Sequence, residues 1–289
     1  MNAPAASDFH SHDLVADFGK PGVRYELKPA TRPGGAVVPG LYNAWITLDN
    51  PSQFNSYTTD MVKGVILAFR AASNARDVNC VVFTGAGDRA FCAGADLSGA
   101  SKSGIDYWLE PRPHGFGGIS FRDTLDIPVI GRVNGHALGG GFEMVLGCDI
   151  VVAAEEATFG LTEPRVGYLP LDGGMVQLQR QVPFRLAMGM MLTGRRFKAR
   201  ELEPWGLFNE VVPRAELDAA VDRWLADVLA CAPLSLRAIK QVVRRTAHMS
   251  PREAQSMRLP AVVEAIRSED GQEGVRAFRE RRKPDWKGR

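Results

Sequence analysis

Two spacings of apolar residues divide the chain into expected strands and expected helices. Residues 80–84 and 127–133 are short runs rich in β-branched residues, which predict buried strands. Residues 23–27 and 43–48 alternate apolar and polar side chains and predict two further strands. Between residues 61 and 69 the apolar positions recur on one face of a helix. This alternation of strands and helices favours an α/β fold with right-handed crossovers.

After the last expected strand, at 208–212, the pattern is helical only. Helices are predicted over 217–230, 235–247 and 250–268. Two of them carry apolar faces, at Leu217, Val221, Trp224 and Leu225 and at Leu259, Val262, Val263 and Ile266. A monomer would have to fold these faces back onto itself, so they predict a homo-oligomer.

Three regions follow from these patterns. Residues 1–22 carry acids and histidines without an apolar stretch, and are expected to form a flexible arm rather than a secretory signal. Residues 23–212 are expected to form the core, and 213–289 a helical region. Within the core, the Pro- and Gly-rich segment 30–40 is interpreted as a long connection between two strands.

Composition excludes several classes of protein. The chain has 289 residues, of which 45% are hydrophobic and 24% charged, as in ordinary soluble proteins. Its net charge of +2 does not suggest a nucleic-acid partner, and no apolar stretch is long enough to span a membrane. The four cysteines are scattered in apolar contexts, which predicts reduced core thiols, no metal site and a cytoplasmic location.

The stretch 126–167 holds the most distinctive chemistry. A strand leads to a turn at Asn134 and Gly135, then to three glycines at 139–141, and then to a helix that contains Glu143. Glycines let the backbone approach a ligand closely, and the first N–H groups of a helix point outward without partners. Such groups bind negative charge, either on a phosphate or on an oxyanion that forms during a reaction.

Two segments in this region resemble the signatures of the crotonase, or enoyl-CoA hydratase/isomerase, family. They are AFCAGADL at 90–97 and GHALGGGFEMVLGCDIVVAAEEATFGLTEPRVG at 135–167. The resemblance implies a crotonase-like superhelix of β-β-α units with a C-terminal helical region that packs between subunits. It also implies an acyl-CoA thioester as substrate, no cofactor beyond the coenzyme A of that substrate, and a homotrimer or homohexamer.

Glu143 and Glu163 match the two acid/base glutamates of the hydratases in this family. Taken alone, Glu143 could simply be a negative charge that the helix dipole stabilises, and Glu163 could be a solvated loop carboxylate. Adding water across an α,β double bond requires two proton transfers, one from the water and one to the α-carbon. Burial beside apolar residues could keep one carboxyl protonated while the other is ionised. We therefore expect this pair to be catalytic.

Ala95 and Gly140 match the family's oxyanion hole. Each would donate a backbone N–H to the thioester oxygen, where negative charge develops in the enolate. The alternative is that both turns are only tight packing sites. That alternative explains each turn separately, but explains poorly why both occur at the expected separation from Glu143 and Glu163.

Contacts with the rest of the substrate are expected at five positions. Asp96 and Leu97 would lie along the coenzyme A channel, and Phe278 and Lys283, in a basic tail, would contact its phosphates across a subunit boundary. Trp108 lies in a segment, 98–123, that is expected to be a mobile loop over the acyl end of the pocket. Its aromatic residues predict a preference for bulky or cyclic acyl groups.

These residues predict an enoyl-CoA hydratase or the reverse dehydratase. The alternatives are another crotonase reaction, either double-bond isomerisation or hydrolytic ring opening, and a non-catalytic RNA-binding homologue. Asp172 is a third carboxylate near the pair in sequence, and Leu171 replaces a glycine found in some family members. Asp172 is interpreted first as a turn residue before two glycines, with a role in the reaction left open.

Overall fold

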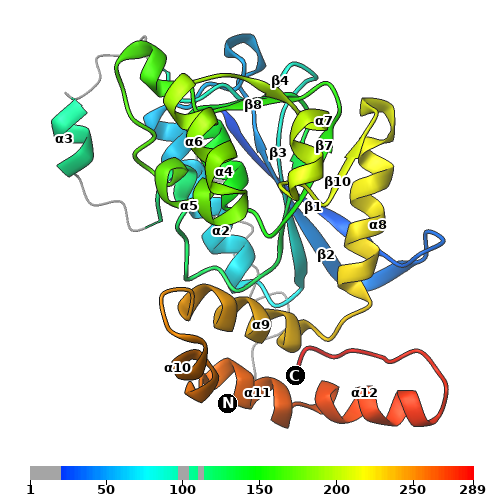
Figure 1. Ribbon diagram of the computed structural model, residues 1–289. Helices are drawn as coiled ribbons and strands as arrows, with labels where there is room; N and C mark the ends of the chain where they lie inside the picture. Colours follow the sequence, from blue (N-terminus) through cyan, green and yellow to red (C-terminus); the bar gives the residue numbers. More distant parts are fainter. Residues whose placement is uncertain (1–20, 97–103, 110–113) are drawn as a thin grey trace.

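The computed structural model describes residues 21–96, 104–109 and 114–289 (Figure 1). Its larger sheet has six strands in the order β1-β2-β3-β5-β7-β10. The first two strands pair antiparallel as a hairpin, and each later pairing is parallel. The strands are β1 (Val23–Thr31), β2 (Val37–Leu48), β3 (Val78–Gly85), β5 (Val129–Val133), β7 (Ile150–Ala154) and β10 (Glu210–Val212).

A second sheet of four short strands follows the first, in the order β4-β6-β8-β9. Three of these strands each come directly after a strand of the larger sheet: β4 (Ala90–Cys92), β6 (His136–Leu138) and β8 (Thr158–Gly160). The fourth, β9 (Phe197–Lys198), pairs antiparallel with β8. The chain therefore repeats a unit of long strand, short strand and helix. Strands of two or three residues are too short to produce a readable period, so the sequence predicted none of them.

Helices cover both faces of the larger sheet (Figure 1). Side chains of β3 alternate between the two faces: Val81 and Phe83 join the core beneath α2 and α4, and Cys80 and Val82 join the core beneath α8. The helices before β10 are α2 (Thr59–Asn74), α3 (Gly104–Leu109), α4 (Gly140–Leu146), α5 (Gly174–Gln181), α6 (Phe184–Thr193) and α7 (Ala199–Leu202). Single 3-10 turns are η2 (Pro51–Gln53), η3 (Phe116–Gly118), η4 (Glu163–Val166), η5 (Glu203–Trp205) and η6 (Arg214–Glu216).

From residue 213 onward the chain is helical, with α8 (Leu217–Leu229), α9 (Pro233–Arg245), α10 (Pro251–Ser256), α11 (Pro260–Arg267) and α12 (Glu269–Arg279). Buried charge fastens α9 to the sheet. The Lys240 amine donates to the backbone oxygen of Ile127 and pairs with Asp149 at 2.6 Å, while Arg244 pairs with Asp149 at 2.9 Å. Helices α9 to α12 form a layer at the bottom of Figure 1, away from α4 and α6.

Three expectations about local structure are wrong. The segment 30–40 is mostly strand, because the hairpin of β1 and β2 extends to a turn in which the Arg32 amide donates to Ala36. The single helix expected over 250–268 is two helices, since Pro260 lacks an N–H and begins α11 instead of continuing α10. The thiol of Cys231 is exposed, whereas Cys80 and Cys92 are buried as expected.

The apolar face of α8 is also placed differently from the expectation. Leu217, Val221 and Leu225 pack against the larger sheet of the same chain, and the Trp224 ring N–H donates to Glu210 at 3.0 Å. This face therefore gives no argument for an oligomer. On α11, Val263 and Ile266 are 40% and 73% exposed, so only this second face stays open to a partner.

Candidate active site

Crowding at the start of α4 explains why three glycines stand there. A methyl group on Gly141 would lie 2.0 Å from the backbone oxygen of Cys92, and one on Gly140 would lie 2.5 Å from the ring of Phe116. Gly139 has φ +54°, a conformation that favours glycine, and it precedes the helix as its N-cap. The glycines thus let β4, the helix and the Phe116 ring meet closely at one point.

Glu143 lies in the first turn of α4, and its side chain is almost fully buried. Its Oε1 accepts two backbone hydrogen bonds, from Gly174 at 2.8 Å and from Asp172 at 3.1 Å. Burial is the main cause that raises the pKa of Glu143 to about 8, and the Gly174 hydrogen bond opposes the shift. The neighbouring carboxylates of Glu163 and Asp172 raise this pKa further, so all three acids belong to one electrostatic cluster.

Glu163 begins the 3-10 turn η4, where Pro164 occupies the next position. Its carboxyl lies against Gly139: a methyl group built there would be 3.1 Å from Oε1. The other oxygen, Oε2, is buried and has no hydrogen-bond partner among the described residues. Burial raises the pKa of Glu163 to about 7. A buried carboxyl oxygen without a partner is available to exchange a proton with a bound molecule.

The two turns expected to form the oxyanion hole come together. A methyl group on Gly94 would lie 3.7 Å from the backbone nitrogen of Gly140, so the chain at Gly94 and Ala95 runs beside the start of α4. The flanking bonds, from Tyr57 N–H to Gly94 and from Asp96 N–H to Tyr57, do not use the Ala95 amide. Gly140 is the first residue of α4, where an N–H has no partner within the helix. Both amides therefore remain available within the described part of the chain.

The structure does not bring the other predicted substrate-binding residues together beside Glu143 and Glu163. Asp96 follows Ala95 directly, and Leu97 lies outside the described residues. Trp108 lies on α3 and is 60% exposed. Phe278, on α12, is 85% exposed, and Lys283 is an exposed residue of the segment after that helix. Helix α12 lies in the bottom layer of Figure 1, remote from α4, which holds Glu143.

Three further residues lie near the two glutamates but were not predicted as site residues from the sequence: Tyr57, Tyr107 and Asp172. The Tyr107 hydroxyl, from α3, donates to Oδ2 of Asp172, which is buried. The Tyr57 side chain is buried beside Phe116, with ring centroids 4.5 Å apart. No motif marks either tyrosine, because each reaches the cluster through contacts between distant segments. For Asp172 the sequence offered only its short distance from Glu163.

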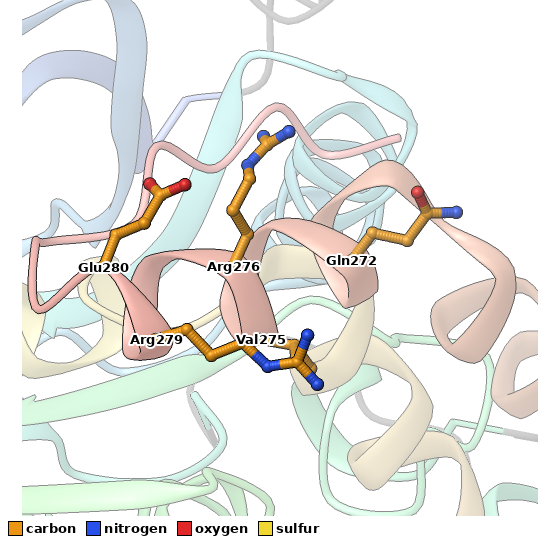
Figure 2. Close-up of a pocket in the computed structure, with 5 residues that line it drawn as sticks. All are labelled: Gln272, Val275, Arg276, Arg279 and Glu280. Atoms are coloured by element: carbon orange, nitrogen blue, oxygen red, sulfur yellow. The ribbon is translucent and has the colours of Figure 1, made fainter.

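A hollow on the surface is formed elsewhere, along α12. Figure 2 shows its lining side chains, which come from α12 and the residue that follows it: Gln272, Val275, Arg276, Arg279 and Glu280. It is separate from the glutamate pair, so we place the candidate site by the buried acids and the free amides instead. Within the described residues, no three or more His, Cys, Asp and Glu side chains are grouped so as to hold a metal ion. No helix in the same residues is both long and apolar enough to cross a membrane.

Comparison with known proteins agrees with this arrangement. Residues 43–289 match the family described as Enoyl-CoA hydratase/isomerase. The chain is 43% identical over 225 residues to 6-oxocyclohex-1-ene-1-carbonyl-CoA hydrolase of Thauera aromatica, a match that covers 75% of this chain and 58% of that protein. It is 38% identical over 250 residues to carnitinyl-CoA dehydratase of Escherichia coli (strain K12), covering 84% and 94% of the two chains.

Solved structures extend the likeness to the fold. The enoyl-CoA hydratase of Bacillus anthracis superposes with a TM-score of 0.81 at 28% identity, covering 93% of this chain and all (100%) of that one. The enoyl-CoA hydratase of Mycobacterium tuberculosis H37Rv gives 0.81 at 27%, with the same coverage. The mixed α/β architecture, with its parallel strands and C-terminal helices, is thus the crotonase fold. The chain belongs to the enoyl-CoA hydratase/isomerase, or crotonase, family.

Proposed function

We propose that this protein is an enoyl-CoA hydratase, or a dehydratase running the reverse reaction. One observation carries the proposal: the buried Glu143 carboxyl and the half-buried Glu163 carboxyl, both with raised pKa values, lie near two backbone amides that have no partner among the described residues. Acid/base work near neutral pH needs groups whose pKa lies near 7. The amides supply the stabilisation that a developing oxyanion requires.

In the hydration direction, the thioester oxygen accepts hydrogen bonds from the Ala95 and Gly140 amides. A water molecule adds to the β-carbon and gives a proton to Glu143, while the electrons of the double bond move to the thioester oxygen as an enolate. The enolate then takes a proton at the α-carbon from Glu163. We assign this second step to Glu163 because it lies against Gly139, next to the oxyanion donor, and the α-carbon is bonded to the thioester carbon.

The two carboxyls must share one proton for this cycle. Hydration starts with Glu163 protonated and Glu143 ionised, and dehydration starts with the opposite arrangement. Since the two acids interact, they titrate as a pair, and both arrangements are accessible near neutral pH. The dehydratase name of one relative supports the dehydration direction.

A second candidate is another enolate reaction, ring opening by hydrolysis. The name of the 43% identical relative favours it, although the match spans only 58% of that protein. Asp172, buried and hydrogen-bonded to Tyr107, favours it as well. A third acid is not needed to add water to a double bond, but could assist a second water. Double-bond isomerisation would use the same pair of glutamates, and a purely RNA-binding homologue would need neither.

Three further proposals complete the substrate complex. Asp96, Leu97 and, on the acyl side, Trp108 line the path of the thioester. Phe278 and Lys283 contact coenzyme A on a neighbouring subunit, because they are exposed and remote from the glutamates of their own chain. The assembly is a homotrimer or homohexamer in the cytoplasm, with coenzyme A entering only as part of the substrate.

Mass spectrometry of products tests the reaction. Purified protein would be incubated with enoyl-CoA thioesters of short, branched and cyclic acyl groups. Hydration and hydrolytic ring opening both increase the mass of the thioester by one water, so fragmentation of the product ion distinguishes the new hydroxyl of hydration from the new carboxylate of ring opening. Isomerisation leaves the mass unchanged. Hydration of at least one thioester, lost in Glu163→Gln, supports the proposal. Isomerisation or ring opening alone would replace it.

A further inference from the structure

Tyr57 lies next to the proposed oxyanion hole. Its backbone runs beside Ala95: the Tyr57 N–H donates to Gly94 at 2.8 Å, and the Asp96 N–H donates to Tyr57 at 3.0 Å. The ring packs against Phe116 in a tilted arrangement, with 4.5 Å between the ring centroids and 37° between the ring planes. Phe116 in turn covers Gly140, where a methyl group would lie 2.5 Å from the ring. The Tyr57 side chain is therefore close to the two residues, Ala95 and Gly140, whose amides are proposed to bind the thioester oxygen.

The hydroxyl at the end of this ring has no hydrogen-bond partner among the described residues, although Tyr57 is only 5% exposed. The Gly117 amide approaches the oxygen without the geometry of a hydrogen bond. Leaving a buried donor without a partner destabilises the folded protein, because the group loses its hydrogen bonds to water and gains none in return. Each such group in a folded protein needs a reason, and a bound ligand that supplies the missing acceptor is one.

The charges around the hydroxyl restrict what that ligand can be. Asp172 and the Tyr107 phenol are close enough to disfavour ionisation of Tyr57, as is the Cys92 thiol. Burial is the main cause that keeps the pKa of Tyr57 well above its usual value, so the group acts as a donor. Glu143 shares the electrostatic environment of Asp172. A negatively charged acceptor would be repelled by these acids, whereas a neutral carbonyl or hydroxyl oxygen would not.

We propose that the Tyr57 hydroxyl, which is buried without a hydrogen-bond partner among the described residues while its ring packs on Phe116, donates a hydrogen bond to a neutral oxygen on the acyl group itself. The preferred substrate is then an oxygenated acyl-CoA thioester, with a ketone or hydroxyl beyond the reacting double bond. This inference rests on the proposed acyl-CoA reaction, and it names the chemical class of the acyl group. Tyr57 acts as a specificity residue and transfers no proton in the reaction.

Tyr57→Phe tests this directly, because it removes only the hydroxyl. The probes are two cyclohexene-carbonyl-CoA thioesters that differ only by a ring ketone. We expect kcat/KM for the ketone to fall roughly tenfold or more, and kcat/KM for the plain ring to stay within about twofold. Tyr42→Phe, a change on β2 outside the site, is the matched control and should alter neither value.

Binding provides a readout that does not depend on turnover. Calorimetry would use the saturated analogues of the same two thioesters, which lack the reacting double bond. The ketone analogue should bind more weakly to Tyr57→Phe than to the parent protein, and the plain-ring analogue should bind equally well to both. The same binding preference for the ketone should remain in Glu163→Gln, in which turnover of both thioesters is expected to fall. A failure of the proposed reaction is therefore told apart from a failure of this inference. Equal losses for both thioesters would identify Tyr57 as a third oxyanion donor and overturn the proposal. An unchanged ratio with a lower Tm would assign it a packing role only, and would overturn it as well.

Discussion

The Glu163 carboxyl occupies the space beside the α-carbon of Gly139: a methyl group on that α-carbon would lie 3.1 Å from Oε1 of Glu163. The absence of a side chain just before α4 therefore leaves room for a carboxyl 24 residues further along the chain. A side chain at position 139 would displace the carboxyl from its place beside the start of α4. It would also be strained by the positive φ of +54° at this position.

Gly139→Ala should consequently reduce kcat at least about tenfold, because a misplaced acid/base group loses its geometry with the α-carbon. Backbone strain alone should cost about 1–2 kcal/mol of stability. Gly206→Ala is the matched control, since Gly206 has φ +74° and nothing within 4 Å of the added methyl group. Steady-state kinetics and urea unfolding of both variants separate the effects. Equal kinetic losses in the two would show that the Glu163 contact has no catalytic importance.

Glu143→Gln and Glu163→Gln should each lower turnover at least about a hundredfold while leaving thioester binding largely intact. Glutamine preserves the shape of the side chain, and in Glu143→Gln its oxygen can still accept the Gly174 and Asp172 hydrogen bonds. Kinetics and calorimetry on the same preparations measure the two quantities. Glu156→Gln, at an exposed position, should behave as the parent protein. Near-normal turnover in either site variant would remove that residue from the mechanism.

The pH dependence of kcat/KM should be bell-shaped. The active pair holds one proton, because burial raises the pKa of Glu163 to about 7 and that of Glu143 to about 8. At lower pH both acids are protonated and no base remains, and at higher pH both are ionised and no acid remains. Rates measured between about pH 5.5 and 9.5 in constant ionic strength test this. A flat profile across neutrality would argue against the shared proton.

Stability should change with pH in the opposite sense to that of a salt-bridged acid. The folded state keeps protons on Glu143 that the unfolded chain loses above its usual pKa of 4.5, so folding is favoured at low pH. This contribution disappears as the pH rises through about 8. Glu143→Gln should thus raise Tm more at about pH 9 than at about pH 5, by an amount equivalent to a few kcal/mol. An equal change at both pH values would contradict the raised pKa.

Trp108→Ala should lower kcat/KM for a bulky acyl group roughly ten- to a hundredfold relative to that for crotonyl-CoA, with Tm unchanged. Trp108 is 60% exposed, so it contributes little to the folded core, and an acyl group could cover its ring. Its neighbour Tyr107 instead donates to Asp172, so Tyr107→Phe separates loss of that hydrogen bond from loss of the indole surface. A fall in Tm with an unchanged substrate ratio would mean that Trp108 serves packing alone.

Short-range patterns in the sequence contained most of what identifies the site. The glycine triplet, Glu143 and Glu163 lie within one stretch of 25 residues (139–163), where local turns and a helix start bring them near one another. The buried strands were readable because their apolar runs are continuous, and α2 because its apolar face repeats at helical spacing. The order and spacing of these motifs along the chain were sufficient to indicate the crotonase family.

Only the tertiary structure could decide what depends on contacts between distant segments. The inward face of α8 and an oligomer interface have the same apolar pattern, and only packing against β3 and β5 separates them. The second sheet is built of strands too short to carry a period. Tyr107 donates a hydrogen bond to Asp172 from 65 residues away in the chain, and both groups influence the pKa of Tyr57, but no local signal in the sequence marks this cluster. The pKa values of the two glutamates follow from desolvation, which arises only when the whole chain closes around them.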